Sequence, residues 1–297
     1  MQKKSTTKLQ LSLIAIAIVV MVIAWTGFSN DNRFIITFVN VGQGDGALVS
    51  TPGGRHILID AGPQESKNNI GSTMLDYITM NSIGKVDIII MSHFHDDHVG
   101  ALQGILSVAG TELILMPTPL SEVERTIASE IAGYAPATTM VRYMKEGESV
   151  ELGENISISA VFQQQTSDEN DKSLINILKY YDSKILFTGD ITTNTEALIL
   201  EKVPKKDLDC DIIKVAHHGS KYASSEEFYQ AVTPQYAVIS VGKNSYGHPT
   251  DEALNRIDRY SDEILRTDEL GSISFVIDKN GIKRESSDNW WNKIFSF

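Results

Sequence analysis

The sequence predicts an α/β fold in which β-sheets pack together with helices outside, preceded by one membrane-spanning segment. Two patterns predict the fold: residues 34–60 are rich in short strands, and strands and helices alternate from residue 86 onward. This order is typical of packed sheets rather than of a doubly wound parallel sheet. No composition shift marks a boundary inside the alternating region, so residues 32–297 are predicted to form one domain. Residues 1–31 are assigned to a cytoplasmic tip and a transmembrane helix.

Alternation of apolar residues, β-branched runs and turn residues give the individual elements. A glycine-rich turn at 41–46 separates the first two strands, and Pro52-Gly53-Gly54 predicts a hairpin. The apolar run 86–91 is expected to be a buried strand that ends directly at Ser92. Strands are predicted at 34–40, 47–50, 55–60, 86–91, 112–116, 156–162, 174–180, 184–188, 211–216, 235–241, 263–266 and 272–277. Helices are predicted at 70–81, 121–132, 191–201, 224–232 and 250–260.

The N-terminal segment has the composition of a membrane anchor. Lys3, Lys4 and Lys8 precede an apolar run from Leu9 to Phe28, which at about 20 residues is long enough to span a bilayer. A positive flank before the span favours a cytoplasmic N-terminus and an exported domain. One alternative is a cleaved signal peptide followed by secretion, although the residues after the run lack a clear small-x-small cleavage site. The other is a buried core helix, which the absence of a polar face disfavours.

Charge and cysteine content exclude several classes of site. The chain carries 26 Lys and Arg against 38 Asp and Glu, a formal net charge of -12. Non-specific binding of polyanions relies on cationic groups, so this balance argues against it, while a local site with metal ions stays compatible. Cys210 is the only cysteine. An intramolecular disulfide and a cysteine-rich zinc site are therefore excluded, and any metal must be held by His, Asp and Glu.

A cluster of ligand-type residues follows the predicted strand 86–91. His93, His95, Asp97 and His98 fall within six residues of a chain that has seven histidines. Alternate residues of an extended segment project to one side, so His93 and His95 can share one ion. Asp97 and His98 can then face a second ion about 3.5–4 Å away. Imidazole and carboxylate ligands suit Zn²⁺, Mn²⁺ or Fe²⁺. The alternative, a polar loop with solvent-exposed histidines, is disfavoured by this density of ligand-type residues.

A second pair of histidines follows the predicted strand 211–216. Adjacent residues of an extended chain point in opposite directions, so only one of His217 and His218 is expected to bind metal. We favour His218 as the ligand and His217 as a contact to the substrate. Ser220 and Lys221 are further substrate-contact candidates, although Lys221 is equally compatible with a solvated surface charge. His56 lies inside a hairpin strand and is given no role.

These motifs resemble the metallo-β-lactamase superfamily, which implies an αββα sandwich and a metal-dependent hydrolase. Leu58-Ile-Asp60-Ala-Gly62 resembles the first motif of that family, whose aspartate orients a ligand histidine, and Leu186-Phe-Thr-Gly-Asp190 resembles the strand end that supplies a metal-bridging aspartate. A carboxylate between two dications offsets their repulsion. The resemblance implies two divalent ions, Zn²⁺ or Mn²⁺, held by His93, His95, Asp97, His98, Asp190 and His218.

Four further stretches resemble the hydrolase domain of ComEC-type DNA-uptake proteins and its free-standing relatives. They are 38–45, 170–174, 216–220 and 246–249. The resemblance implies that His248 lies across the site, where it binds phosphate or protonates a leaving oxygen. The alternative is a histidine that only precedes the helix at Thr250. Glycines 42, 44 and 46 are expected to form a structural turn, with Asp45 supporting the metal ligands from behind.

One departure from the superfamily pattern concerns the first ion. Many superfamily hydrolases place a third histidine between the first cluster and the bridging aspartate, and this sequence has none between His98 and Asp190. The ion of His93 and His95 would then complete its shell with Asp190, water or a weak ligand such as Asn170, which is also a substrate-binding candidate. The large channel of ComEC-type proteins has no counterpart among these residues.

The expected reaction is hydrolysis of a phosphodiester by a metal-activated water, with Asp97 and His248 as catalytic residues and Asp190 as the alternative to Asp97 for orienting that water. The substrate is expected to be DNA or another cell-envelope polymer, acted on by an extracytoplasmic domain that contacts the membrane through its N-terminal helix. Three alternatives stay open. They are a phosphocholine esterase acting on teichoic acid, a lactonase or β-lactamase-like hydrolase of the same fold, and a degenerate ligand-binding domain.

Overall fold

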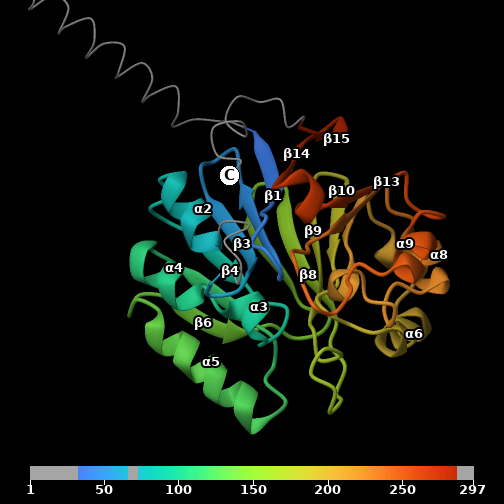
Figure 1. The fold of residues 1–297 in the computed structure, drawn as a ribbon. Coiled ribbons are helices and arrows are strands. Elements are labelled where there is room, and N and C mark those ends of the chain that lie inside the picture. The colour runs from blue at the N-terminus through green and yellow to red at the C-terminus, as the bar shows by residue number, and fades with distance from the viewer. Residues whose placement is uncertain (1–32, 66–72, 286–297) are drawn as a thin grey trace, which may run out of the picture.

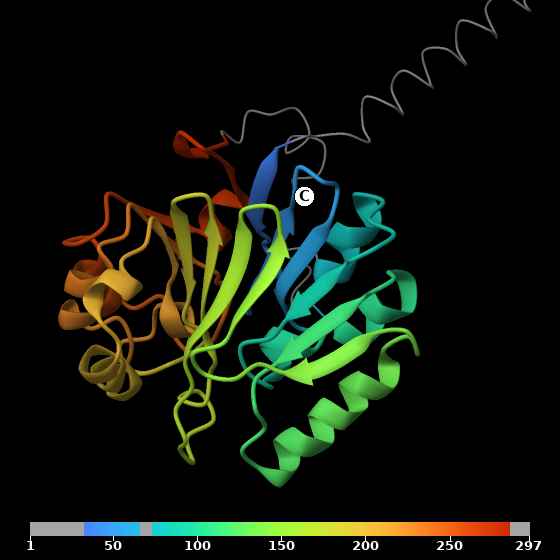
Figure 2. The ribbon, with the colours of Figure 1, turned by 180° about the vertical axis from the view of Figure 1, so that it is seen from behind.

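The computed structural model describes residues 33–65 and 73–285. Two β-sheets lie face to face, and helices cover the outer face of each sheet (Figures 1 and 2). The predicted α/β sandwich is confirmed. The predicted membrane span, residues 9–28, lies outside the described residues. Within the described ranges, no helix has the length and apolar character needed to cross a membrane.

The first sheet joins the beginning and the end of the domain. Its antiparallel part runs from β15 to β3, and its parallel part continues through β4, β5 and β6. In spatial order the strands are β15 (Gly281–Arg284), β14 (Ile273–Asp278), β1 (Phe34–Phe38), β2 (Gly46–Ser50), β3 (His56–Ala61), β4 (Ile88–Ile90), β5 (Leu113–Met116) and β6 (Met140–Tyr143).

The second sheet repeats this plan. Antiparallel pairing joins β7 to β10, and parallel pairing joins β10 to β13. In spatial order the strands are β13 (Glu263–Arg266), β12 (Tyr236–Ile239), β11 (Ile212–Lys214), β10 (Ser183–Phe187), β9 (Ile175–Tyr180), β8 (Ile156–Phe162) and β7 (Ser149–Gly153). Each sheet therefore has parallel strands whose carboxyl ends lie at one edge.

Aromatic side chains fill the space between the two sheets. Phe38 of β1 stacks on Phe187 of β10 at 6.0 Å between ring centroids, and Phe34 stacks on Tyr180 of β9 at 4.1 Å. Phe275 of β14 meets Phe38 edge-on, with centroids 6.2 Å apart. Such pairs contribute roughly 0.5–1.5 kcal/mol beyond the area that they bury. They hold the two sheets in a fixed relation, on which the geometry of the loops at the sheet edge depends.

Apolar stripes hold the helices on the outer faces. On the first sheet lie α2 (Met74–Met80), α4 (Leu102–Val108) and α5 (Glu122–Tyr134), and on the second lie α6 (Thr193–Lys202), α8 (Glu226–Val232) and α9 (Asp251–Ile257). The short helices are α3 (Asp96–Val99), α7 (Lys205–Leu208), α10 (Thr267–Leu270) and the 3₁₀ segment η1 (Ala216–Gly219). Side-chain caps decide where several helices begin: Thr73 caps α2, which therefore starts at Met74 rather than at residue 70.

Three strands were not predicted from the sequence, and all three are edge strands. β6 and β7 each end a sheet, and β15 ends the first sheet on the other side. An edge strand has one neighbour, so its side chains are half-exposed and its apolar alternation is weak. The burial of Met140–Tyr143 shows this, because both end residues are exposed. The helices α3, α4, α7 and α10 were also missed, because α3, α7 and α10 have only four residues each and α4 contains Gly104.

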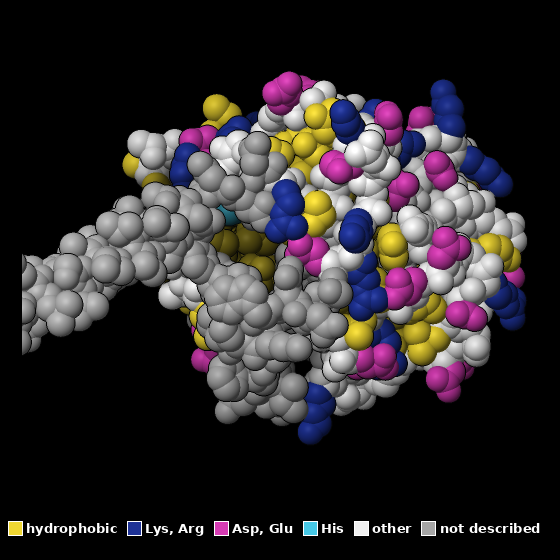
Figure 3. Space-filling view, turned by 90° about the horizontal axis from the view of Figure 1, so that it is seen from above, with side chains coloured by type: hydrophobic (Ala, Val, Ile, Leu, Met, Phe, Trp, Pro, Cys, Tyr) yellow, Lys and Arg dark blue, Asp and Glu magenta, His cyan; other side chains and the backbone are white. Residues whose placement is uncertain are grey.

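The end of the sandwich near β14 and β15 has a mixed surface charge. In the view of Figure 3, Lys and Arg side chains alternate with Asp and Glu, and no continuous basic area is visible on this face.

The aromatic contact between the sheets gives a stability prediction. Replacement of Phe38 by Ala is expected to lower the free energy of unfolding by about 3–5 kcal/mol, because it removes a fully buried ring from between both sheets. Replacement of the 62% exposed Val123 by Ala is the matched control and should change stability by less than about 0.5 kcal/mol. Urea unfolding followed by far-UV circular dichroism measures both. Equal stabilities of the two variants would contradict the prediction.

Candidate metal centre

The candidate site forms where carboxyl ends of strands from both sheets meet. β4 leads into Ser92 and the segment that ends with α3, β10 leads into Asp190, and β11 leads into η1 with His217 and His218. Carboxyl ends of parallel strands lie at one edge of a sheet, and such edges are common ligand sites in α/β proteins. Side chains more than 100 residues apart in sequence are thereby placed side by side.

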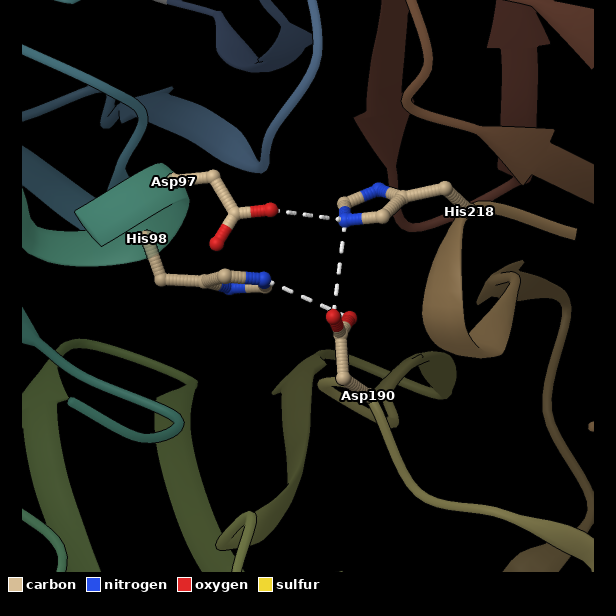
Figure 4. Close-up of side chains that lie close together, drawn as sticks. All are labelled: Asp97, His98, Asp190 and His218. Atoms are coloured by element: carbon tan, nitrogen blue, oxygen red, sulfur yellow. Dashed lines mark hydrogen bonds and ion pairs between the residues drawn. The ribbon is translucent and has the colours of Figure 1, made fainter. Parts of the chain in front are cut away.

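Asp97, His98, Asp190 and His218 form a compact group, here called the four-residue cluster (Figure 4). Their ligand-type atoms all lie within 4.8 Å of one another. His218 Nε2 is 3.3 Å from Asp97 Oδ2 and 3.4 Å from Asp190 Oδ2, and His98 Nε2 is 3.3 Å from Asp190 Oδ1. A tetrahedral ion with ligands at about 2.0–2.1 Å keeps its ligand atoms about 3.3–3.4 Å apart. The spacing fits a single divalent cation.

The two imidazoles of the cluster are oriented from behind. Nδ1 of His98 lies 3.0 Å from Asp60 Oδ2, and Nδ1 of His218 lies 2.8 Å from the carbonyl oxygen of Ser240. A proton on each Nδ1 satisfies these acceptors, so that in the neutral form of each ring the lone pair is on Nε2, which faces the cluster. This arrangement is the usual support of a metal-binding histidine.

Asp60 also binds Ser92, the residue that directly precedes His93. Its carboxylate accepts hydrogen bonds from the backbone N–H and the hydroxyl of Ser92, at 2.8 and 2.7 Å. The Ser92 hydroxyl also lies 3.0 Å from Nδ1 of His93. Ser92 was not singled out from the sequence, and its position between a buried strand and His93 is the signal that could have found it. Asp60 and Ser92 together position two histidines.

The charges inside the cluster shift the pKa values of its residues in the direction opposite to the effect of burial. Burial by itself lowers the pKa of His98 and His218, but the carboxylates of Asp190 and Asp45 outweigh it and raise both pKa values well above the usual range. Burial by itself raises the pKa of Asp190, yet His218 and His98 hold it well below its usual range. His98 Nε2 and Asp190 Oδ1 are buried and make no hydrogen bond. A divalent cation would satisfy these groups, and so the donor set fits a metal ion.

His93 and His95 lie beside this cluster. Their rings are 4.6 Å apart, and His93 is 4.1 Å from the ring of His98. Neither belongs to a group of three or more ligand-type residues that already converge in the described part of the chain. His93 is buried, and its Nε2 makes no hydrogen bond. Burial, with the neighbouring His98, lowers the pKa of His93 well below the usual value, which leaves the ring neutral.

A buried ion pair lies beneath the cluster. Lys214 Nζ contacts the carboxylate of Asp45, lies 3.5 Å from Asp190 Oδ1, and donates a hydrogen bond of 3.1 Å to the carbonyl oxygen of Gly189. Asp45 in turn lies 3.5 Å from His98 Nδ1 and 3.3 Å from His218 Nδ1. Sequence reasoning missed Lys214, although it is the only charged residue of β11. It offsets the negative charge collected around the two histidines.

The glycine-rich turn at residues 41–46 positions Asp45 beside the cluster. The backbone N–H of Asp45 donates to the carbonyl oxygen of Asp97 at 3.0 Å. Gly44 has a φ of +145°, and a Cβ added there would lie 2.3 Å from that same oxygen. Only glycine allows this approach. The structure therefore agrees with a structural turn at Gly44.

The local conformation of His217 and His218 differs from the expectation. They were treated as an extended pair, but both have left-handed backbone angles, with φ of 50° and 53°, inside η1. Gly219 follows with φ of +80°, and a Cβ there would meet Pro249 at 2.5 Å. The tight turn carries His218 into the cluster and leaves His217 half-buried beside it, with ring centroids 6.4 Å apart. The premise was wrong because close packing against Pro249 forces a turn.

The remaining predicted residues surround the cluster at different depths. The ring of His248 lies 5.5 Å from that of His217, so the two imidazoles form one edge of the site. Burial, then His217, lowers the pKa of His248 to about 4. Ser220 is buried and accepts a hydrogen bond from the backbone N–H of Tyr222 at 3.3 Å, whereas Lys221 is exposed over the Tyr222 ring. Asn170 lies in the loop after β8, with hydrogen bonds through its backbone.

A family model described as "Metallo-beta-lactamase superfamily" matches residues 39–243, which include every residue of the four-residue cluster. The chain belongs to the metallo-β-lactamase superfamily. Superfamily membership confirms the resemblance seen in the sequence motifs, and it agrees with the sandwich and with a metal-binding cluster at the sheet edge.

Curated relatives of this superfamily member include competence proteins. ComE operon protein 3 of Bacillus subtilis is 27% identical over 260 residues, which cover 81% of this chain and 32% of that protein. Competence protein ComA of Neisseria gonorrhoeae is 27% identical over 256 residues, which cover 86% of this chain and 34% of that protein. The chain thus spans about a third of the length of these relatives. The predicted similarity to ComEC-type proteins is confirmed at this modest identity.

Solved structures with the same fold extend the comparison. The metallo-β-lactamase fold protein YhfI from Bacillus subtilis aligns with a TM-score of 0.57 at 12% identity, over 82% of this chain and 99% of that one. Zn²⁺-bound PqqB from Methylobacterium extorquens aligns with a TM-score of 0.52 at 10% identity, over 85% and 91% of the two chains. At these identities the similarity shows the fold.

The Lys214–Asp45 pair gives a prediction about stability. Replacement of Lys214 by Met is expected to lower the free energy of unfolding by about 3–5 kcal/mol, because it leaves the buried Asp45 carboxylate without its countercharge. The double variant Lys214→Met/Asp45→Asn should recover most of this loss, because the buried carboxylate that Lys214 contacts is then removed as well. Urea unfolding of the chelator-treated proteins measures the cycle. A double variant less stable than Lys214→Met would show that the two side chains are not coupled in this way.

Proposed function

We propose that this chain is a metal-dependent phosphodiesterase, and specifically a nuclease that acts on DNA. The observation that carries the proposal is the four-residue cluster, in which buried imidazoles and carboxylates converge with the spacing of ligands to one divalent ion. Membership in the superfamily and similarity to competence proteins support it.

Two divalent ions, Zn²⁺ or Mn²⁺, fit the ligand-type residues of the proposed centre. One would be held by Asp97, His98 and His218. The other would be held by His93 and His95, whose ring centroids lie 4.6 Å apart in an edge-on arrangement. Asp190 would bridge the two. Its carboxylate is buried between the histidines and carries a full negative charge, which offsets the repulsion between two dications.

The bound ions would supply the Lewis acidity that lets water attack a phosphodiester near neutral pH. Asp97 is the most exposed residue of the cluster, with 34% of its side chain accessible, so its carboxylate is placed to orient the attacking water. Asp190 is buried and holds the geometry of the centre. The chain thus separates a residue that faces the substrate from residues that fix the site.

His217 and His248 are proposed to contact the phosphate and the leaving oxygen. With its pKa lowered to about 4, His248 is neutral at physiological pH and carries a single ring N–H. A neutral imidazole donates a hydrogen bond to a phosphate oxygen, and it does not act as an imidazolium acid above pH 4. Ser220 and Lys221, on the loop after His218, would extend the phosphate contacts.

Three competing functions share the same fold. A lactonase or β-lactamase-like hydrolase is disfavoured because the third histidine on which such enzymes usually rely is absent between His98 and Asp190. A degenerate binding domain is disfavoured by the complete cluster. A phosphocholine esterase acting on teichoic acid shares the phosphodiester chemistry, and the choice between it and a nuclease depends on the substrate assay below.

We further propose that the domain works outside the cytoplasm, on the membrane anchor predicted at residues 9–28. The support is the apolar run with three lysines before it. The anchor would keep the catalytic domain at the membrane surface, where incoming DNA or envelope polymers are found.

Asp97 and the adjacent Asp96 provide a matched pair of positions for testing the proposed activity. The full chain, purified in detergent, should hydrolyse bis-p-nitrophenyl phosphate and single-stranded DNA when Mn²⁺ or Zn²⁺ is added. The isosteric variant Asp97→Asn should lower kcat/KM at least about 100-fold, because loss of even a supporting residue costs 10- to 100-fold. Asp96→Asn is the matched control. Asp96 is exposed and lies outside the cluster, so this variant should retain activity.

The outcomes separate the competing functions. Preference for DNA supports the nuclease, and activity on choline-phosphate esters without DNA cleavage selects the esterase. Metal bound without turnover of any phosphodiester would overturn the proposed function and favour a binding domain.

The role of His248 has its own test. His248→Ala is expected to lower kcat/KM for single-stranded DNA by about 10-fold or more, whereas His248→Gln, which keeps an N–H donor, should retain most activity. Both variants should keep the pH profile of the unmodified chain between pH 5 and 9, because a group with a pKa of about 4 stays deprotonated throughout. A limb of the profile near pH 6–7 that disappears in His248→Gln would instead identify His248 as a proton donor.

A further inference from the structure

The loop between β8 and β9 occupies the stretch of sequence where many superfamily members have their third metal-binding histidine. It is attached to the metal centre at its far end. The Ser173 hydroxyl donates to the carbonyl oxygen of Asn170 at 2.7 Å and accepts a hydrogen bond from the backbone N–H of Asp190 at 3.1 Å. The next residue, Leu174, donates its N–H to the carbonyl oxygen of Ser92 at 2.8 Å. The loop is therefore fixed relative to both the cluster and His93.

Two aspartates shape the loop so that residue 169 lies over the site. Asp168 Oδ1 accepts hydrogen bonds from the backbone N–H groups of Asn170 and Asp171, at 3.0 and 3.2 Å. Asp171 accepts bonds from the backbone and side chain of Thr192, at 2.7 and 3.0 Å. Such aspartate-centred turns set the direction of the intervening side chains. Glu169 and Asn170 are the two residues between these anchors.

Glu169 reaches the more exposed of the two histidines. Its Oε2 lies 3.4 Å from Nε2 of His95. This separation equals the 3.3–3.4 Å between ligand atoms in the four-residue cluster, and it is longer than the 2.7–2.9 Å of a charge-assisted hydrogen bond. The two atoms are thus spaced as joint ligands of one ion.

The buried Lys172 lies near Glu169 but contacts another glutamate more closely. Lys172 Nζ is 3.0 Å from Glu124 Oε1 and 3.7 Å from Glu169 Oε1. Glu124 is the closer and more deeply buried partner, so the charge of Lys172 is satisfied mainly there. Oε2 of Glu169 is left for the contact with His95.

His93, whose ring lies beside that of His95, has a ring nitrogen without a hydrogen-bond partner. Its Nε2 is buried without a hydrogen bond, and its ring lies 4.6 Å from that of His95. We propose that Glu169 is a further protein ligand, beside the shared Asp190, of the ion held by His93 and His95, in the role that a histidine has in other superfamily members. The proposal rests on the metal centre of the proposed function. Two imidazoles and one glutamate form a donor set that zinc sites use.

The proposed ligands must still close onto the ion. His93, His95 and Glu169 are not among the groups whose ligand atoms already lie within 4.8 Å of one another in the described residues. The side chains of His95 and Glu169 are 35% and 51% exposed, so both are free to turn toward the buried His93. This open geometry makes the ion of this site the weaker of the two.

The test counts ions and their affinities without using activity. The full chain is purified in detergent, stripped with a chelator and titrated with Zn²⁺ by calorimetry, and the visible spectrum of the Co²⁺-loaded protein reports its coordination. The unmodified chain should bind two ions. Glu169→Ala and Glu169→Gln should each weaken the second ion at least 10-fold, because an amide oxygen is a poor substitute for a carboxylate. Glu169→His should restore it, and Asn170→Ala should bind two ions as the unmodified chain does.

Each remaining outcome has a defined meaning. Two ions of unchanged affinity in Glu169→Ala overturn the proposal, as does a single ion in the unmodified chain. Normal binding by Glu169→Gln would make Glu169 a hydrogen-bonding partner of His95 rather than a ligand, and loss of the second ion in Asn170→Ala would transfer the role to Asn170. The proposed function is tested separately, because a chain that binds two ions through Glu169 but cleaves no phosphodiester refutes the phosphodiesterase alone.

Discussion

The site depends on the neutralisation of several carboxylates gathered in one small volume. Asp45, Asp60 and Asp190 are each buried, and Asp97 lies beside them. Unpaired charges of this kind would cost several kcal/mol each in the interior of a protein. The structure meets each carboxylate with a specific partner: the Lys214 ammonium, the Ser92 donors or an imidazole. These pairings decide which histidine nitrogen faces inward, and thereby the metal-binding geometry.

The same charges connect the two halves of the sandwich. His98 follows a strand of the first sheet and His218 follows a strand of the second, and Asp45 lies between their Nδ1 atoms. The aromatic pairs Phe38–Phe187 and Phe34–Tyr180 set the distance between the sheets over their length. Apolar packing thus sets the distance between the two sheets, and the ionic contacts set the positions of the histidines at their edge. The cluster is a product of both.

The sequence was sufficient for the sandwich, for most central strands and for the grouping of chemistry at strand ends. It failed at edge strands such as β6 and β7, where single-sided pairing weakens the apolar pattern. Asp97, His98, Asp190 and His218 were chosen from motifs, and the structure places them together, while their role as ligands stays a prediction. Lys214 and Glu169 were missed because a lysine inside an apolar strand and a glutamate in a polar loop resemble ordinary residues until the fold brings them to the histidines.

The close contact between Gly242 and the turn at Gly42 has a consequence for how related sequences can diversify. A Cβ at Gly242 would lie 2.4 Å from the backbone carbon of Gly42, so the backbones of the two sheets' loops touch there with no side chain between them. Substitutions at Gly242 therefore cannot enlarge the space around the four-residue cluster without moving the backbone of the turn at Gly42. New substrate preferences would have to arise in the peripheral loops that carry Lys221 and His248. Insertions there would change what reaches the four-residue cluster and leave the support of its histidines by Asp60 and Ser240 intact.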